Sequence, residues 1–271
     1  MVNERARKIL EDLEKTLRRF MRKHEITHDE YRDATDILVA TVKAGEGSLL
    51  CDVFFEAEAT DNDNRRRQGS VEAVEGPFYV PNAPRLEVPY ALPQRPHGAG
   101  EVLFFRGRVA SLRGTPLAGV ELDMWQADAD GHYSNVDSNV PEWNLRGRFY
   151  SGSDGTFEVQ TIVPPPYEIP KSGPTGLVLS CLGRHFFRPA HLHLKLRHPQ
   201  YVALTTQLYF DGGDYLLTDV ANAVRDGLIT KLVRRDHATE LTARGLNSPF
   251  YEVHFDFVLV PRSAEGVRHT A

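Results

Sequence analysis

His191 and His193 lie one residue apart, and their spacing is the first feature of the sequence that could support chemistry. On a β-strand, residues i and i+2 project from the same face, so the two imidazoles would be directed at one point. That arrangement suits a pair of metal ligands, with Leu192 and Leu194 facing the opposite layer. Two histidines on the solvated face of a half-exposed strand would give the same pattern, so the motif alone leaves both interpretations open.

A metal site would need further ligands, and tyrosines are the candidates. The sequence has no cysteine pair and no His-Glu-x-x-His motif, which removes the commonest zinc arrangements. Tyr133 follows a predicted strand, and Tyr167 follows three prolines that hold the backbone extended. Phenolate oxygen has an ordinary pKa near 10, so ligation at neutral pH requires a strong Lewis acid such as Fe(III). Tyrosines that simply pack with their hydroxyls at the surface are the alternative.

The composition restricts the class of protein that could carry such a site. The chain has 271 residues, 41% of them hydrophobic, and a formal net charge of −5, so it can bury a full core and has no basic excess for nucleic acid. Cys51 and Cys181 are too few for a disulfide framework. The opening residues lack the apolar segment of a secretory signal, and no apolar run is long enough to span a bilayer. We therefore expect a cytoplasmic globular protein.

The first 70 residues predict a group of helices. Ile9, Leu10, Leu13, Leu17, Phe20 and Met21 recur at spacings of three and four, which makes one apolar stripe on a charged helix. Thr27 and Glu30 form a capping-box pattern that opens a second helix toward Val42. A third apolar stretch covers residues 49–55, and the polar run 60–67 predicts an exposed loop. We predict an N-terminal helical region over residues 1–70.

The sequence pattern changes near residue 71, where prolines and glycines begin to separate short runs of residues that favour β-strands. In the last of these runs, Val253, Phe255, Phe257 and Leu259 alternate with other residues. With no long helical stretch between the runs, the pattern predicts a mainly β protein with an antiparallel β-sandwich core over residues 71–271, and a short helix within 219–232. The predicted strands are Val102–Val109, Val120–Ala127, Thr156–Ile162, Ala190–Leu196, Leu204–Phe210 and Val253–Val260.

Several motifs, in order, resemble those of the intradiol ring-cleaving dioxygenases, in the branch that acts on catechol, chlorocatechol and hydroxyquinol. The resemblance covers about residues 27–260. Its strongest elements are Gly76-Pro77-Phe78-Tyr79, Trp125-Gln126-Ala127-Asp128, Gly131-His132-Tyr133, Asn144-Leu145-Arg146-Gly147, Pro166-Tyr167-Glu168-Ile169-Pro170, Gly173-Pro174-Thr175-Gly176, Gly183-Arg184-His185, Arg188-Pro189-Ala190-His191-Leu192-His193, Thr205-Thr206-Gln207 and Phe210-Asp211-Gly212-Gly213.

The resemblance implies a role for particular residues. The family's four protein ligands to one non-haem Fe(III) per subunit match Tyr133, Tyr167, His191 and His193. By the same match, Tyr167 is the axial ligand that leaves the metal when substrate binds, while Arg188 and Gln207 contact the aromatic ring. The implied reaction cleaves a catechol with O2 to a cis,cis-muconate without an external reductant. Without the resemblance, a surface salt bridge for Arg188 and a sheet hydrogen bond for Gln207 would be the simpler readings.

The resemblance also implies a substrate pocket that is small and mostly apolar, with one carboxylate. Catechol and substituted catechols are the expected substrates, with hydroxyquinol, which would give maleylacetate, as the alternative. Asp52 would suit a third ring hydroxyl, but chlorocatechol enzymes carry an acid there too, so it does not discriminate. Any single apolar member could equally be ordinary core. The implied lining residues are Leu49, Asp52, Val53, Val74, Gly76, Phe78, Tyr79 and Ala221.

The N-terminal stripe over residues 9–21 needs a partner surface. The resemblance implies a homodimer through these helices, with phospholipid tails held at the interface; docking of the stripe on the chain's own β-core is the alternative.

A second class of protein also fits part of the sequence. Gly107-Arg108-Val109 and the turn at 114–120 resemble the opening of transthyretin-like β-sandwich binding modules, which lack the two tyrosines and two histidines.

Overall fold

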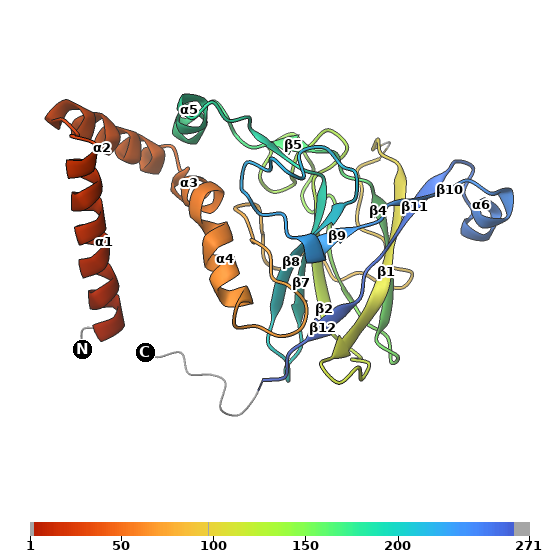
Figure 1. The fold of residues 1–271 in the computed structure, drawn as a ribbon. Coiled ribbons are helices and arrows are strands. Elements are labelled where there is room, and N and C mark those ends of the chain that lie inside the picture. The colour runs from red at the N-terminus through yellow and green to blue at the C-terminus, as the bar shows by residue number, and fades with distance from the viewer. Residues whose placement is uncertain (1–2, 97, 263–271) are drawn as a thin grey trace.

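The computed structural model describes residues 3–96 and 98–262, and it divides into an N-terminal group of helices and a β core (Figure 1). The Thr27–Glu30 capping box is present at the start of α2, as predicted. The helices are α1 (Glu4–Lys23), α2 (His28–Lys43), α3 (Gly47–Cys51), the π-helical turn η1 (Asp52–Glu56), α4 (Ala57–Asn64), α5 (Pro174–Cys181), the 3-10 turn η2 (Asp226–Leu228) and α6 (Ala238–Arg244).

Two five-stranded sheets and one short two-stranded sheet make up the β core. The first sheet contains β10, β11, β1 and β12 with β4 paired to β1; the second has the order β3-β2-β7-β8-β9; β5 pairs with β6. The strands are β1 (Val102–Ser111), β2 (Glu121–Trp125), β3 (Arg146–Tyr150), β4 (Thr156–Ile162), β5 (Tyr167–Glu168), β6 (Phe187–Arg188), β7 (His191–Arg197), β8 (Leu204–Phe210), β9 (Ile229–Thr230), β10 (Val233–Arg235), β11 (Phe250–His254) and β12 (Phe257–Leu259).

The two larger sheets share one hydrophobic core. Leu103 and Phe105 of β1 belong to the same buried cluster as Leu192 and Leu194 of β7, and all four side chains are fully buried. The prediction of a mainly β core behind an N-terminal helical segment is confirmed. The sheets are mixed, however, because β1 runs parallel to β11 and β12, and β8 runs parallel to β9. These parallel pairs join segments about 20 to 150 residues apart, which local sequence patterns do not report.

Three local predictions were wrong or incomplete. Residues 60–64 belong to helix α4 instead of an exposed loop, although their polar character is explained by solvent exposure along much of the helix. Helices α5 and α6 were not predicted between the strands. The short helix expected within 219–232 is reduced to the 3-10 turn η2. In each case the segment lacks the apolar periodicity that distinguishes a packed helix.

The last predicted strand, residues 253–260, is divided into β11 and β12 by a break at Phe255 and Asp256. Both pieces keep one register along β1, since Leu103 lies opposite Tyr251 and Val109 lies opposite Phe257. The break occurs where β1 carries Gly107, at which an added Cβ would lie 1.8 Å from the carbonyl oxygen of Phe255. Glycine therefore allows the two backbones to approach at this point.

Substitution of Gly107 by Ala should destabilise the protein by roughly 3 kcal/mol, because the new methyl group would overlap a backbone oxygen that cannot easily move. Urea unfolding monitored by circular dichroism measures this change. Gly47→Ala is the matched control, since its added Cβ would meet no atom within 4 Å. Equal stability of the two variants would contradict the close approach.

Helix α1 stands away from the β core at one end of the molecule, joined to it through α2 (Figure 1). It has no buried residue, and its apolar stripe is open to solvent, with Leu13 51% exposed and Phe20 53% exposed. The stripe therefore does not dock on the chain's own β core, which was one of the two sequence-based alternatives. In the described part of the chain, no helix combines the length and apolar character needed to cross a membrane.

Candidate metal centre and active site

Strand β7 places the two histidines that the sequence singled out. His191 and His193 project from one face, while Leu192 and Leu194 project into the core from the other, as the period of two requires. The two Nε2 atoms lie 2.9 Å apart, and each side chain is 2% exposed. His191 Nδ1 lies 2.7 Å from the carbonyl oxygen of Pro189, which can only accept, so Nδ1 carries the proton and Nε2 is free to bind a metal.

A tight turn after β2 positions Tyr133. Asp128 Oδ1 accepts the backbone N–H groups of Asp130 and His132, and Asp137 accepts that of Tyr133 at 2.7 Å. Asp128, Asp130 and His132 also have a spacing that a metal ion could use, but their carboxylates pair with Arg95, at 3.2 Å for Asp128 and 2.5 Å for Asp130. The acidic groups therefore have a structural partner, and their hydrogen bonds shape the turn that presents Tyr133.

Tyr167 enters the site from the two-stranded sheet β5–β6, where it lies directly opposite Arg188 in the pairing register. The proline run before it fixes the approach of the chain, as expected for residues restricted to extended backbone. Gly131 adopts φ +86° and passes so close that an added Cβ would lie 3.1 Å from the Cβ of Tyr167. Strand β5 and the turn that carries Tyr133 are therefore packed against each other. The rings of Tyr133 and Tyr167 lie edge to face, with 5.2 Å between their centroids.

The four predicted ligands thus converge from three separate parts of the chain. Tyr167 lies 5.6 Å from His191, and Tyr133 lies 6.2 Å from His193, measured between ring centroids. Burial raises the pKa of Tyr133 well above its ordinary value, and burial likewise raises that of Tyr167. Burial lowers the pKa of His191 to about 3 and that of His193 well below its ordinary value. Without a metal, all four groups are therefore neutral at pH 7.

The donor set fits a highly charged metal ion. The amide of Gln207 donates to His193 Nδ1 at 3.3 Å, so in the metal-free protein His193 Nε2 carries the proton and donates to His191 Nε2 at 2.9 Å. Bonds of about 2.1 Å from both Nε2 atoms to one ion would replace that hydrogen bond and keep the two nitrogens at roughly this separation. The Tyr133 hydroxyl is buried without a hydrogen-bond partner among the described residues. Such an orphaned oxygen is the expected state of a ligand atom, because a buried hydroxyl otherwise finds a partner.

A buried arginine behind Tyr133 strengthens this fit. Arg146 is 1% exposed, and its guanidinium carbon lies 5.8 Å from the centre of the Tyr133 ring. Its hydrogen bonds go to the carbonyl and hydroxyl of Ser134, and no carboxylate lies within 4.0 Å in the described part of the chain. A buried cation without an acidic partner is costly. An ionised Tyr133 would supply the missing negative charge, as a metal-bound phenolate does.

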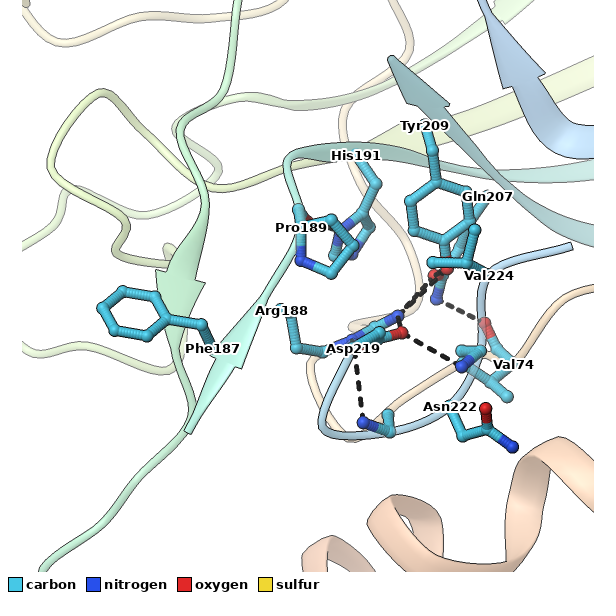
Figure 2. A network of polar contacts seen from close by, with 12 residues as sticks. Val74, Phe187, Arg188, Pro189, His191, Gln207, Tyr209, Asp219, Asn222 and Val224 are labelled. Atoms are coloured by element: carbon cyan, nitrogen blue, oxygen red, sulfur yellow. Dashed lines mark hydrogen bonds and ion pairs between the residues drawn. The ribbon is translucent and has the colours of Figure 1, made fainter. Parts of the chain in front are cut away.

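Arg188 and Gln207 also reach the site. Arg188 is 4% exposed and Gln207 is fully buried, and Arg188 Nη2 donates to Gln207 Oε1 at 3.0 Å. Arg188 also forms a buried ion pair with Asp219, at 3.0 Å from Nε to Oδ1 (Figure 2). Burial opposes the charge of Arg188, but Asp219 more than compensates and the pKa of the guanidinium is raised. The simpler reading of Arg188 as a surface salt bridge is wrong, because its ion pair is buried.

A small cavity lies beside these residues, lined by Tyr167, His193 and Arg188. It offers only about 20 Å³ of space for the centres of water molecules, which is room for one or two waters. A ring-sized ligand therefore requires a lining group to move. Of the predicted pocket residues, those that line the cavity are Leu49, Asp52, Val53, Val74, Gly76, Phe78 and Ala221.

Tyr79 is the predicted pocket residue that the structure places elsewhere. Its ring packs on Trp125 at 4.9 Å between centroids, and its hydroxyl donates to Asp123 at 2.9 Å while accepting from Arg197. Tyr79 thus supports the site from behind Trp125, which itself stacks on His193 at 4.6 Å.

Sequence reasoning did not select several residues that belong to the site. Glu56 lines the cavity, with its carboxylate accepting the backbone N–H groups of Glu75 and Gly76, and it follows Asp52 by one turn. That spacing was available in the sequence, but the π-helical turn η1 that brings both acids to the cavity was not. Asp219 and Tyr209 were also missed, since neither has a local pattern that distinguishes it from a loop acid or a core aromatic residue.

Comparison with known proteins agrees with this fold. Residues 3–70 match the family model described as "Catechol dioxygenase N terminus", and residues 74–261 match the model described as "Dioxygenase". A chlorocatechol 1,2-dioxygenase of Cupriavidus pinatubonensis is 37% identical over 233 residues, which is 84% of this chain and 89% of the relative. A 6-chlorohydroxyquinol 1,2-dioxygenase of the same species is 37% identical over 273 residues, covering 96% and 92%.

A solved structure is similar over nearly the whole chain. The 3-chlorocatechol 1,2-dioxygenase of Rhodococcus opacus superposes with a TM-score of 0.89 at 37% identity, covering 95% of this chain and 99% of its own. The fold and site define a ring-cleaving dioxygenase, and the chain belongs to the intradiol dioxygenase family. It is an intradiol dioxygenase enzyme, similar to those that act on catechols, chlorocatechols and hydroxyquinols. The transthyretin-like binding module is therefore not its class.

The two buried histidines predict how the metal-free protein responds to acid. Both pKa values lie below the ordinary 6.5, so between pH 6.5 and about 3 the unfolded chain binds protons that the folded chain does not. Stability therefore rises with pH in this window and is lost on acidification. Relative to a His191→Gln/His193→Gln variant, the metal-free wild type should lose about 2 kcal/mol per histidine between pH 7 and pH 5.

Urea unfolding of both metal-free proteins at the two pH values measures this difference. The comparison with the variant cancels the buried carboxyl groups, whose pKa shifts act on both proteins alike. An identical pH dependence in wild type and variant would contradict the burial of neutral imidazoles at this site.

Proposed function

We propose that each subunit holds one non-haem Fe(III) through Tyr133, Tyr167, His191 and His193, and that the enzyme cleaves catechol or a substituted catechol with O2 to a cis,cis-muconate. The observation that carries the proposal is the convergence of two neutral imidazoles and two phenols, all buried, of which Tyr167 and His193 line the cavity. When bound, Fe(III) supplies a Lewis acid that favours ionised phenol and catechol oxygens and activates the ring toward O2.

Three residues of the chain have separate roles in the proposed reaction. Tyr167 lines the cavity, so its phenolate oxygen is placed to accept a proton from an incoming diol. The protonated Tyr167 would then move aside, and an oxygen of the diol would take its place. That exchange would also provide the movement that the closed cavity needs. Arg188 presents a fixed positive charge beside the ring, where it stabilises the negative charge that develops as the ring reacts. Gln207 holds Arg188 Nη2 and donates to the carbonyl oxygen of Val74 at 2.7 Å.

The cavity supports a small ring with limited substituents. Leu49, Val53 and Ala221 give apolar walls, while Asp52 and Glu56 add two carboxyl groups at one side. Burial raises the pKa of both acids, and both carboxyl groups accept hydrogen bonds, Asp52 from Ser48 and Glu56 from the backbone of Glu75 and Gly76. Chloro- and methylcatechols suit the apolar walls. Hydroxyquinol is the alternative substrate, because a third hydroxyl would find its partners in Asp52 and Glu56.

Colour and products test this function together. The purified iron-loaded protein should be burgundy, because phenolate-to-Fe(III) charge transfer absorbs visible light, and Tyr167→Phe should bleach or shift that band and lose most activity. Tyr201→Phe, at a partly buried tyrosine outside the site, is the matched control. Ultraviolet spectra and mass spectrometry should show a muconate from catechol. A colourless protein that leaves catechol intact, or a 2-hydroxymuconic semialdehyde product, would contradict the proposal.

Values of kcat/KM for catechol, 3- and 4-chlorocatechol, methylcatechols and hydroxyquinol then identify the preferred ring. A methylene-sized difference in such a pocket changes specificity by about 1–3 kcal/mol. A preference for hydroxyquinol that disappears in Asp52→Asn would support the alternative substrate.

We also propose that residues 1–70 form the dimerisation and linker region and 71–271 the catalytic domain, and that two subunits associate through α1. An amphipathic helix with an open apolar stripe lowers its free energy by burying that stripe against a second copy. Phospholipid tails held between the two helices would cover apolar surface that remains, and basic residues of α1 would suit the headgroup. The two cysteines are free thiols, which suits the reducing cytoplasm.

Leu13→Glu/Leu17→Glu should convert the protein from a dimer to a monomer, because both side chains are about half exposed on α1 and charge on the stripe opposes its burial. Light scattering coupled to size-exclusion chromatography measures the mass. Lys15→Ala/Arg19→Ala is the control, since it lowers the net charge by the same amount on other faces of the helix. A wild type that is monomeric, or a double-glutamate variant that remains dimeric, would contradict the assembly.

A further inference from the structure

The catalytic guanidinium of Arg188 is held on two of its three nitrogens. Nε donates to Asp219 Oδ1, and Nη2 donates to Asp219 Oδ2, Gln207 Oε1 and the Tyr209 hydroxyl, each at 3.0 Å (Figure 2). Nη1 has no hydrogen-bond partner within residues 3–96 and 98–262, although the guanidinium lines the cavity. The protein contacts therefore select which edge of Arg188 faces the substrate.

Asp219 has more contacts than an ion pair requires. Its Oδ1 also accepts the backbone N–H of Ala221 at 3.2 Å, and its Oδ2 accepts that of Ala223 at 3.0 Å. Ala221 lines the substrate cavity, so the carboxylate that orients Arg188 also fixes the loop that forms one wall of the pocket. The side chain is 2% exposed, and the ion pair outweighs the cost of burial, so the pKa of Asp219 is lowered and it remains charged.

Tyr209 connects the other two members of the network. Its hydroxyl accepts from Arg188 Nη2 and donates to Gln207 Oε1, so the amide oxygen of Gln207 is held in place from two sides. Tyr209 lies in β8 opposite His191 in β7, with no contact to the cavity itself. Its hydroxyl thus serves Arg188 and Gln207, while its ring packs in the core.

A stacked pair of aromatic rings holds the two ends of this arrangement together. Phe187, the residue before Arg188, lies 4.5 Å from Tyr215 between centroids with a 3° angle between the rings. Tyr215 belongs to the same loop as Asp219, four residues earlier in the chain. The short strand that carries the arginine is therefore anchored to the loop that carries its carboxylate.

We propose that Asp219 and Tyr209 are positioning residues that turn the Nη1 edge of Arg188 toward the aromatic ring of the substrate. Asp219 additionally couples this orientation of Arg188 to the pocket wall at Ala221. The inference rests on the proposed ring-cleaving function. It assigns different consequences to the two residues: Tyr209 affects the rate alone, whereas Asp219 affects both the rate and the choice between ring substituents.

Three variants separate these consequences. Tyr209→Phe should lower kcat for catechol about tenfold, with KM and the ratio of kcat/KM for 4-chlorocatechol to catechol unchanged. Asp219→Asn should lower kcat by about a hundredfold and also change that ratio about fivefold or more, because the Ala221 loop is released. Tyr150→Phe is the matched control, since it removes a half-buried hydroxyl that donates to Glu121 at 2.9 Å and does not line the cavity.

The melting temperature and the anaerobic binding of 4-nitrocatechol, followed by its absorbance, accompany the kinetics. Tyr209→Phe should bind this ring with wild-type affinity, which a merely loosened site would not do. If Asp219→Asn does not fold, Asp219→Glu, which keeps the charge but displaces it, provides the test at this position. If neither Asp219 variant folds, Tyr209→Phe alone decides.

Wild-type kcat in Tyr209→Phe, or an unchanged substituent ratio in a folded Asp219 variant, would overturn the inference. A wild-type protein that leaves catechol intact would instead contradict the proposed function. The two failures are therefore distinguishable in one set of assays.

Discussion

The structure depends on the exclusion of solvent from four polar donor groups that lie at one site. Tyr133, Tyr167, His191 and His193 are each at most 5% exposed, and burial holds all four neutral when no metal is bound. Between the two imidazoles there is one hydrogen bond, and the Tyr133 hydroxyl has no hydrogen-bond partner among the described residues. A shared cation would satisfy all four at once. The low-dielectric surroundings of these four groups would therefore make their interaction with a metal ion strong.

The second requirement is that the charged groups near the cavity be balanced and fixed. Arg188 is balanced by Asp219, whereas Arg146 forms no ion pair within 4.0 Å in the described part of the chain and lies over the ring of Tyr133. The first guanidinium is thus available to the substrate in one orientation, and the second favours negative charge on a ligand. Strand β7 joins this site to the rest of the molecule, because its leucines are core residues and its histidines are site residues. The two histidines are consequently held by a strand of the core.

Much of the arrangement could be predicted where the relevant physics is local. The alternation of β7 predicted that His191 and His193 share a face, and the capping box at Thr27 predicted where α2 begins. Long polar segments were harder, because helix α4 forms from residues without apolar periodicity. The break between β11 and β12 was missed for a different reason. It reflects the approach of Phe255 to Gly107, a contact between residues about 150 positions apart.

The sequence by itself determined the chemistry of the donors: which imidazoles and phenols are present, that no thiolate site is possible, and which side chains of a strand point together. These follow from residue type and backbone period, which act over a few residues. Only the tertiary structure decided that Glu56 lines the cavity, that Tyr79 does not, and that Asp219 and Tyr209 hold Arg188. Those facts depend on which distant segments meet, and burial and partner charges exist only after they have met.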